Sequence, residues 1–224
     1  MDIPANLLPT AWLWLAALLY AVLLVAALLT APWQKLTDNE GSNVYFGAIA
    51  CTALVWILRA GIEPGHNYHL LGMTALCLMF EWQFALLAAS LVLVITTWQG
   101  PAAWEAFAVN ILVMGALPVL FSRALLYASQ RWLPYNFFIY IFLNAFFAGA
   151  LAILISGVAA AGVLALAGAT GGSYLQVVPL LMFGEAFLNG LTMILLVVYK
   201  PRWVATFHDL WQRRVREQPQ SPPT

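Results

Sequence analysis

The sequence consists mainly of long apolar runs separated by short polar segments. A membrane-spanning helix needs about 20 mostly apolar residues. The runs follow one another at Ala11–Thr30, Val44–Leu58, His69–Phe80, Phe84–Trp98, Glu105–Leu126, Asn136–Leu166 and Gln176–Tyr199. The strict apolar–polar alternation of barrel strands is absent. The pattern therefore predicts an all-α, polytopic membrane helix bundle with about seven transmembrane helices.

Two of these runs depart from the usual length. The run His69–Phe80 is short and is stopped by Glu81-Trp82-Gln83. The run Asn136–Leu166 is too long for one upright span, so we expect tilt, a bend near Gly157 or extension beyond the bilayer. After Pro201 the chain becomes polar and basic. We therefore predict a single bundle over residues 1–203 and a basic, disordered cytoplasmic tail over residues 204–224.

The composition sets the solvent and excludes several classes of function. Hydrophobic residues make up 63% of the chain and charged residues only 8%, against about 25% in a soluble domain. Lipid must therefore surround most of the chain, and we expect a multi-pass protein of the cell inner (plasma) membrane. Nine basic and nine acidic residues leave no excess of positive charge for nucleic acid.

Known catalytic motifs are absent from the sequence. No phosphate-binding Gly-x-x-x-x-Gly-Lys motif occurs, so active transport would need a separate ATPase. No nucleophilic triad pattern or His-Glu-x-x-His motif occurs either. We predict no catalytic residues and a protein that is not an enzyme.

The basic residues predict the orientation, because cytoplasmic loops are enriched in lysine and arginine. With seven spans and the N-terminus outside, eight of the nine basic residues fall on the cytoplasmic side. Only Arg59 falls outside. Six spans would divide the basic residues between the two sides, so seven spans are favoured.

The densest polar cluster is the segment 63–69, on the predicted outer side. His66 and His69 are three residues apart, so one helical turn would place them on one face. Neutral imidazole is the commonest metal ligand. The alternative is an interfacial loop whose histidines face water, and the spacing alone leaves both readings open.

Four polar residues lie at membrane depth: Asn110, Asn144, Glu185 and Asn189. Ionisable residues inside a membrane are costly and by default suggest function. Glu185 is the clearest of them, with Asn189 one turn later. It is either a substrate contact or a structural carboxyl group that hydrogen-bonds to another helix. In both cases we expect it to face the bundle interior.

Several segments, in their order along the chain, resemble the CbiM/NikM family of substrate-capture membrane subunits in energy-coupling-factor cobalt and nickel importers. The likeness covers most of the chain. It rests on Met1-Asp2-Ile3 with Leu7-Leu8-Pro9, on Asn67-Tyr68-His69-Leu70-Leu71-Gly72-Met73-Thr74, on Ala108-Val109-Asn110 with Met114, and on Val178-Pro179 followed by Gly184-Glu185.

The resemblance implies a permease subunit for uptake of Co²⁺ or Ni²⁺. Its partners would be a membrane coupling subunit and a cytoplasmic ATPase. The family holds its metal with the N-terminal amine, a histidine at position two and a later histidine. Carried over, this gives the Met1 amine and His69. Position two is Asp2, which substitutes a carboxylate for the ring and also leaves Zn²⁺ or Cu²⁺ open.

We therefore predict a metal site on the outer side formed by Met1, Asp2, His66 and His69. Glu63 or Asn67 would support these ligands from behind. Two alternatives remain at this point. One is a membrane-embedded metalloenzyme that uses Glu63, His66 and His69. The other is a family member that kept the fold without metal transport.

Overall fold

The computed structural model describes residues 2–58, 60–63, 66–100, 103–169 and 172–207 of the 224, with the backbone alone at 60–63, 66–67 and 172–174. The described chain is mainly helical. Its helices are α1 (Thr10–Thr30), α2 (Asn39–Ile57), α3 (Met73–Gln99), α4 (Phe107–Ile111), α5 (Leu117–Trp132), α6 (Phe137–Ile139), α7 (Ala148–Leu166) and α8 (Gly172–Tyr199). Short 3₁₀ turns lie at Ala5–Leu7, Trp33–Leu36, Trp104–Ala106 and Pro201–Trp203.

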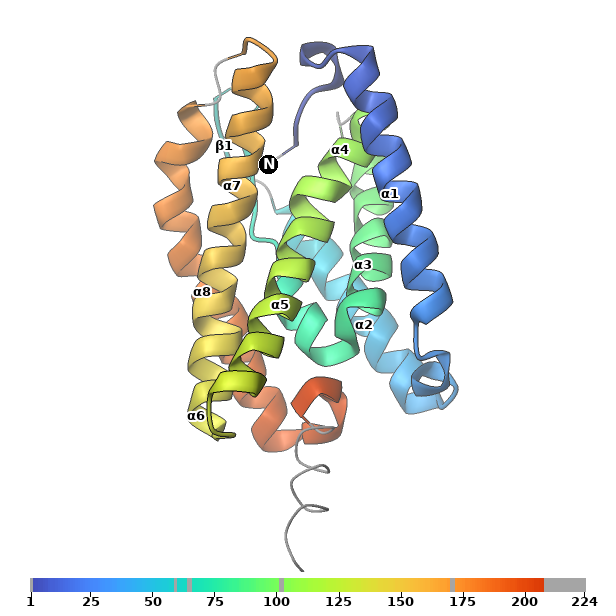
Figure 1. Cartoon of the computed structure of the whole chain (residues 1–224), viewed down its shortest axis with the longest axis vertical. Helices are drawn as coiled ribbons and strands as arrows, with labels where there is room; N and C mark the ends of the chain where they lie inside the picture. The colour runs from blue at the N-terminus through green and yellow to red at the C-terminus, as the bar shows by residue number, and fades with distance from the viewer. Residues whose placement is uncertain (1, 59, 64–65, 101–102, 170–171, 208–224) are drawn as a thin grey trace, which may run out of the picture.

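Two long membrane helices are built from several of these pieces. A π-helical turn at Leu112–Ala116 joins α4 to α5, and a longer π-helical segment at Tyr140–Phe147 joins α6 to α7. Within the described residues, five helices are long and apolar enough to cross a membrane on their own, and α2, at 19 residues, is not one of them. The protein is thus a polytopic, all-α membrane bundle (Figure 1).

Helix α3 contains two helical segments of opposite direction, because the backbone breaks at Glu81 with φ 70° and ψ 169°. Left-handed φ values of this kind end a helix. The Glu81 carboxylate is held by Lys35, whose Nζ lies 2.7 Å from Oε1. The predicted stop at Glu81 is confirmed.

The contacts on either side of Glu81 show the reversal. Before it, Gly72 binds Glu185 and Leu78 accepts a hydrogen bond from Thr206, so this segment runs in the same direction as α8. After it, Gln83 donates to the Thr30 carbonyl and Ser90 binds Tyr20, so the chain runs against α1. Because α1 and α8 run in the same direction (Figure 1), the number of passes is odd, which agrees with seven described helical segments: α1, α2, the two parts of α3, α4–α5, α6–α7 and α8.

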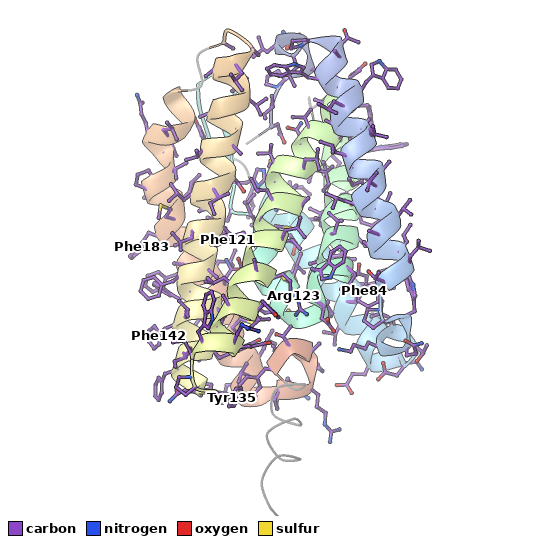
Figure 2. All side chains as sticks on the ribbon, in the orientation of Figure 1. Phe84, Phe121, Arg123, Tyr135, Phe142 and Phe183 are labelled. Atoms are coloured by element: carbon purple, nitrogen blue, oxygen red, sulfur yellow. The ribbon has the colours of Figure 1, made fainter. Side chains whose placement is uncertain are left out.

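The two ends of the bundle differ in charge. The N-terminus lies toward the upper end in Figure 1, and the last described residues lie at the lower end. Arg123 lies in this lower half (Figure 2), and Lys35, Lys200 and Arg202 flank helix ends there. The positive-inside rule predicts that this basic end is cytoplasmic and that the N-terminus is outside.

A short antiparallel hairpin, β1 (Ala60–Glu63) and β2 (His66–Tyr68), follows α2. The apolar pattern did not predict it, and a helical turn carrying His66 and His69 is wrong, because the backbone is extended at 66–68. At the end of the bundle the chain is no longer surrounded by lipid. Water can therefore bind the backbone N–H and C=O groups that the hairpin leaves unpaired.

The packed part of the chain extends past residue 203. Val204 is fully buried, and the Thr206 hydroxyl donates to the Leu78 carbonyl at 2.7 Å and meets the Tyr140 hydroxyl at 2.6 Å. The division into a bundle over 1–203 and a tail over 204–224 stays a prediction, because residues 208–224 lie outside the described chain.

Candidate metal site

Asn110 holds the N-terminal segment inside the bundle. Its Oδ1 accepts a hydrogen bond from the Ile3 amide at 2.8 Å, and its Nδ2 donates to the Ile3 carbonyl at 3.3 Å. An amide side chain offers one acceptor and donors in a plane, which matches both polar groups of a backbone residue. Asn110 and Ile3 are 2% and 1% exposed. Ile3 is therefore held within the protein interior.

We call this pair of hydrogen bonds between Asn110 and Ile3 the clamp. It places Asp2 in a buried position, although aspartate normally remains in water. Asp2 is only 8% exposed and directly precedes the clamped residue. Met1 lies outside the described residues. The sequence indicated Asn110 as a polar residue at membrane depth, and its partner is the N-terminal backbone.

His69 lies at the end of the hairpin, where the chain enters the bundle. The side chain is 3% exposed, and its ring lies 4.7 Å from the ring of Trp56 on α2. Nδ1 is 3.1 Å from the Leu70 carbonyl oxygen. A carbonyl can only accept, so this hydrogen bond requires the proton on Nδ1, which leaves the lone pair of the neutral ring on Nε2. Metal-binding histidines show this same arrangement, with the second nitrogen bound to a backbone carbonyl.

Helix α8 fixes the segment that follows His69. The Glu185 carboxylate accepts from the Leu71 amide at 2.8 Å and from the Gly72 amide at 2.7 Å. Asn189 accepts from the Ala75 amide at 2.7 Å and donates to Glu185 Oε1 at 3.0 Å. We call these two side chains, Glu185 and Asn189, the α8 clasp. Both are 1% exposed or less.

The clasp supplies what the start of α3 needs. The first amides of a helix have no partner within it and carry a partial positive charge. Helix α3 starts inside the bundle, with Gly72 at its N-cap in the left-handed region at φ 68° and no side-chain cap of its own. The carboxylate of Glu185 therefore satisfies, from another helix, the Leu71 and Gly72 amides at and just before the start of α3.

Two further residues complete the support. Trp56 Nε1 donates to the Leu71 carbonyl at 2.9 Å. A Cβ on Gly149 of α7 would lie 2.7 Å from the Asn189 amide nitrogen, so glycine makes room for the clasp. No sequence pattern indicated this role for Trp56, because tryptophan near a span end is ordinarily read as an interfacial anchor.

The predicted site residues divide into three groups. Asn110, Glu185 and Asn189 bind the two segments that carry Asp2 and His69. Asn144 is a separate structural residue, and its Oδ1 accepts from the Ser129 hydroxyl at 2.8 Å. Met1 and the side chains of Glu63, His66 and Asn67 lie outside the described residues. Within the residues described, no group of three or more His, Cys, Asp or Glu side chains is placed to hold a metal ion, so the set Met1, Asp2, His66 and His69 stays a prediction.

Comparison with known families decides the identity. The model of the family CbiM, described as the cobalt uptake substrate-specific transmembrane region, matches residues 2–203. The chain belongs to this family. As a CbiM family member it is a membrane permease component for transition-metal uptake, in agreement with the resemblance of its motifs. No curated protein sequence matches the chain.

Solved structures agree with the fold. A structure titled as a truncated transition metal transporter covers 89% of this chain and 99% of its own, with a TM-score of 0.76 at 16% identity. A second, titled as a transition metal transporter, covers 98% of this chain and 95% of its own, with a TM-score of 0.66 at 17% identity. At these identities the likeness establishes the architecture that the CbiM family member shares with them.

Proposed function

We propose that the protein captures Co²⁺ or Ni²⁺ from the outer side of the cell inner (plasma) membrane, as the substrate-binding component of an importer. The ligands would be the Met1 amine, Asp2, His66 and His69. The observation that supports this most directly is that the segment carrying Asp2 and the segment carrying His69 are both fixed inside the bundle. Asn110 holds one through Ile3, and the α8 clasp holds the other.

The chemistry of the proposed set suits a divalent transition metal. An amine, a carboxylate and one or two imidazoles make a mixed nitrogen and oxygen set that accepts Co²⁺, Ni²⁺, Zn²⁺ and Cu²⁺. The carboxylate of Asp2 is a harder donor than a histidine ring, so it weakens the preference for the planar geometry of Ni²⁺. Glu63 and Asn67 would orient the ligands from behind.

We further propose that a membrane coupling subunit and a cytoplasmic ATPase drive uptake. The chain itself lacks the phosphate-binding motif that an ATP-driven motor requires. Expression of the chain with and without such a motor tests the function. Cells that carry the wild-type chain and the motor should accumulate more ⁵⁷Co²⁺ or ⁶³Ni²⁺ than cells that carry the His69→Ala chain and the same motor. Equal accumulation in the two strains would contradict metal capture at His69.

Asn110→Leu should weaken metal binding without unfolding the bundle. The substitution removes both hydrogen bonds to Ile3 and so releases the segment that carries Asp2. Loss of a group that orients a ligand typically costs about 10–100-fold in metal affinity. Isothermal titration of the purified variant with Co²⁺ measures the change.

Asn144→Leu is the matched control, since it removes a buried asparagine that contacts Ser129 instead of the N-terminal segment. It should leave the metal affinity unchanged. Equal losses in both variants would show that any buried asparagine acts through the stability of the bundle.

The two alternative functions receive different support. The metalloenzyme reading needs Glu63 and His66, whose side chains lie outside the described residues, so it gains nothing from the structure. A family member without metal transport would be revealed by metal titration of the purified protein. The clamped N-terminal segment favours capture over that alternative.

A further inference from the structure

An apolar groove of about 810 Å³ runs along the bundle between α2 and α8. One wall is the α2 face that carries Gly47 and Cys51, and the other is the α8 face that carries Thr192 and Leu196. Leu71, Gly72 and the first segment of α3, as far as Met79, also contribute to its lining. The neighbouring surfaces of α2 and α8 expose large side chains such as Leu54 (62%) and Leu191 (56%), as surfaces in lipid do.

The groove becomes polar at the basic end of the bundle. Asn39, Asn43 and Glu40 at the start of α2 line it there, together with Trp203. A second, more polar pocket of about 360 Å³ shares Glu40 and Trp203 with the groove. The two cavities therefore adjoin at Glu40 and Trp203, whose side chains are hydrogen-bonded to each other.

The polar pocket presents charges of both signs. Lys35 and Arg202 line it, and so do Asp38 and Glu40. Three of these groups have defined contacts: Lys35 binds Glu81, Asp38 caps α2 through the Gly41 amide, and Glu40 accepts from Trp203 Nε1 at 2.7 Å. A ligand that carries an anion and a cation close together would complement this pocket, whereas an ion of one sign would meet repulsion.

We infer that the groove binds one phospholipid of the leaflet at the basic end, with a zwitterionic headgroup that carries a primary ammonium. Its acyl chain lies between α2 and α8, and its headgroup lies in the polar pocket. The phosphate faces Arg202 and Lys35, and the ammonium faces Glu40 and Asp38. A groove that opens to the hydrocarbon of a bilayer fills with hydrocarbon, since protein interiors do not keep voids of this size.

The glycines of the chain offer a matched test. A Cβ added to Gly47 or to Gly162 meets nothing within 4 Å, and both positions are exposed on membrane helices. Gly47 lies in the groove and Gly162, on α7, does not. Gly47→Trp should therefore fill the groove, while Gly162→Trp adds the same side chain to an unrelated lipid-facing surface.

Native mass spectrometry after purification in detergent measures retained lipid. The wild-type protein and Gly162→Trp should retain one phospholipid, and Gly47→Trp should retain none. Absence of bound lipid from the wild type, or equal retention in all three proteins, would overturn the site. Loss of lipid in both variants would also overturn it, because the loss would then be independent of the groove.

Exchange into nanodiscs of defined composition tests the headgroup. Phosphatidylethanolamine should be retained about tenfold over phosphatidylglycerol, as expected for one charge-assisted hydrogen bond. Equal or better retention of phosphatidylglycerol would overturn the headgroup assignment.

A label at Cys51 separates lipid from a partner helix. Cys51 is exposed in the groove and Cys77 is buried, so the native chain has one accessible thiol within its described residues. A small, membrane-permeant maleimide should alkylate Cys51 more slowly than it alkylates Leu18→Cys in a Cys51→Ala background, because a retained lipid covers Cys51. Leu18 is 63% exposed on α1. Equal alkylation rates would overturn a retained lipid, and protection of Cys51 only when a coupling subunit is present would assign the groove to that protein.

Discussion

Purified protein is expected to bind one divalent transition metal, and His69→Ala should weaken that binding by more than about 100-fold. Substitution of a supporting residue alone costs about 10–100-fold, so loss of a ligand costs more. His69 is buried, and its Nδ1 lies beside a backbone carbonyl, so its Nε2 lone pair is fixed in direction. Titration with Co²⁺, Ni²⁺, Zn²⁺ and Cu²⁺ measures the change, and the affinities should broadly follow the Irving–Williams order.

A variant with one residue added before Met1 provides the sharper comparison. The extension keeps every side chain of the native protein and moves only the amine. Affinity should fall to a similar extent as in His69→Ala if the amine is a ligand. Binding by the wild-type protein should also weaken as pH falls, because amine and imidazole must lose protons to bind metal.

A wild-type protein that binds no metal more tightly than either variant would contradict the site. The chain would then be a CbiM family member that kept the fold for another purpose. A loss in His69→Ala without a loss in the extended variant would keep the histidine as a ligand and remove the amine from the set.

The lengths of the apolar runs and the positions of the charged residues were sufficient to predict a polytopic membrane helix bundle. The break at Glu81 was predictable because a charged residue followed by Trp82 and Gln83 interrupts an apolar run that is too short to span. The widened helix at Tyr140–Phe147 was not predictable in the same way. The long run predicted tilt, a bend near Gly157 or extension beyond the bilayer, whereas α7 is continuous at Gly157 and the irregular segment ends about three turns earlier.

The sequence identified which polar residues matter more readily than it identified their partners. Asn110 and Glu185 stood out because polar groups at membrane depth must be satisfied. Their partners are backbone amides and carbonyls at residues 3, 71 and 72, which have no side-chain signature. Contacts of this kind depend on how distant segments meet, so no local pattern encodes them.

Glu185→Leu should destabilise the protein by about 2–6 kcal/mol, since it leaves one buried and one partly buried amide without an acceptor, at about 1–3 kcal/mol each. These amides belong to Leu71 and Gly72, and the carboxylate also accepts from Asn189. Glu185→Gln should fall between the wild type and Glu185→Leu. Its amide oxygen replaces one carboxylate oxygen, while its amide nitrogen faces a donor and cannot replace the other. The order of the three stabilities is measured by thermal unfolding in detergent, with the yield of monodisperse protein as the readout.

The position of Glu185 also connects stability to the metal site. The two amides it binds follow His69 by two and three residues, so the folded fraction of Glu185→Gln should bind metal more weakly than the wild-type protein. Glu105→Leu is the control, because Glu105 is exposed at a helix end and its substitution should change stability by no more than about 0.5 kcal/mol. Equal loss of folded protein in Glu185→Gln and Glu185→Leu would refute the hydrogen-bonding role. If folded Glu185→Gln binds metal as tightly as the wild-type protein, the α8 clasp only holds the helices together. His69 would then be positioned by Trp56 and the Leu70 carbonyl.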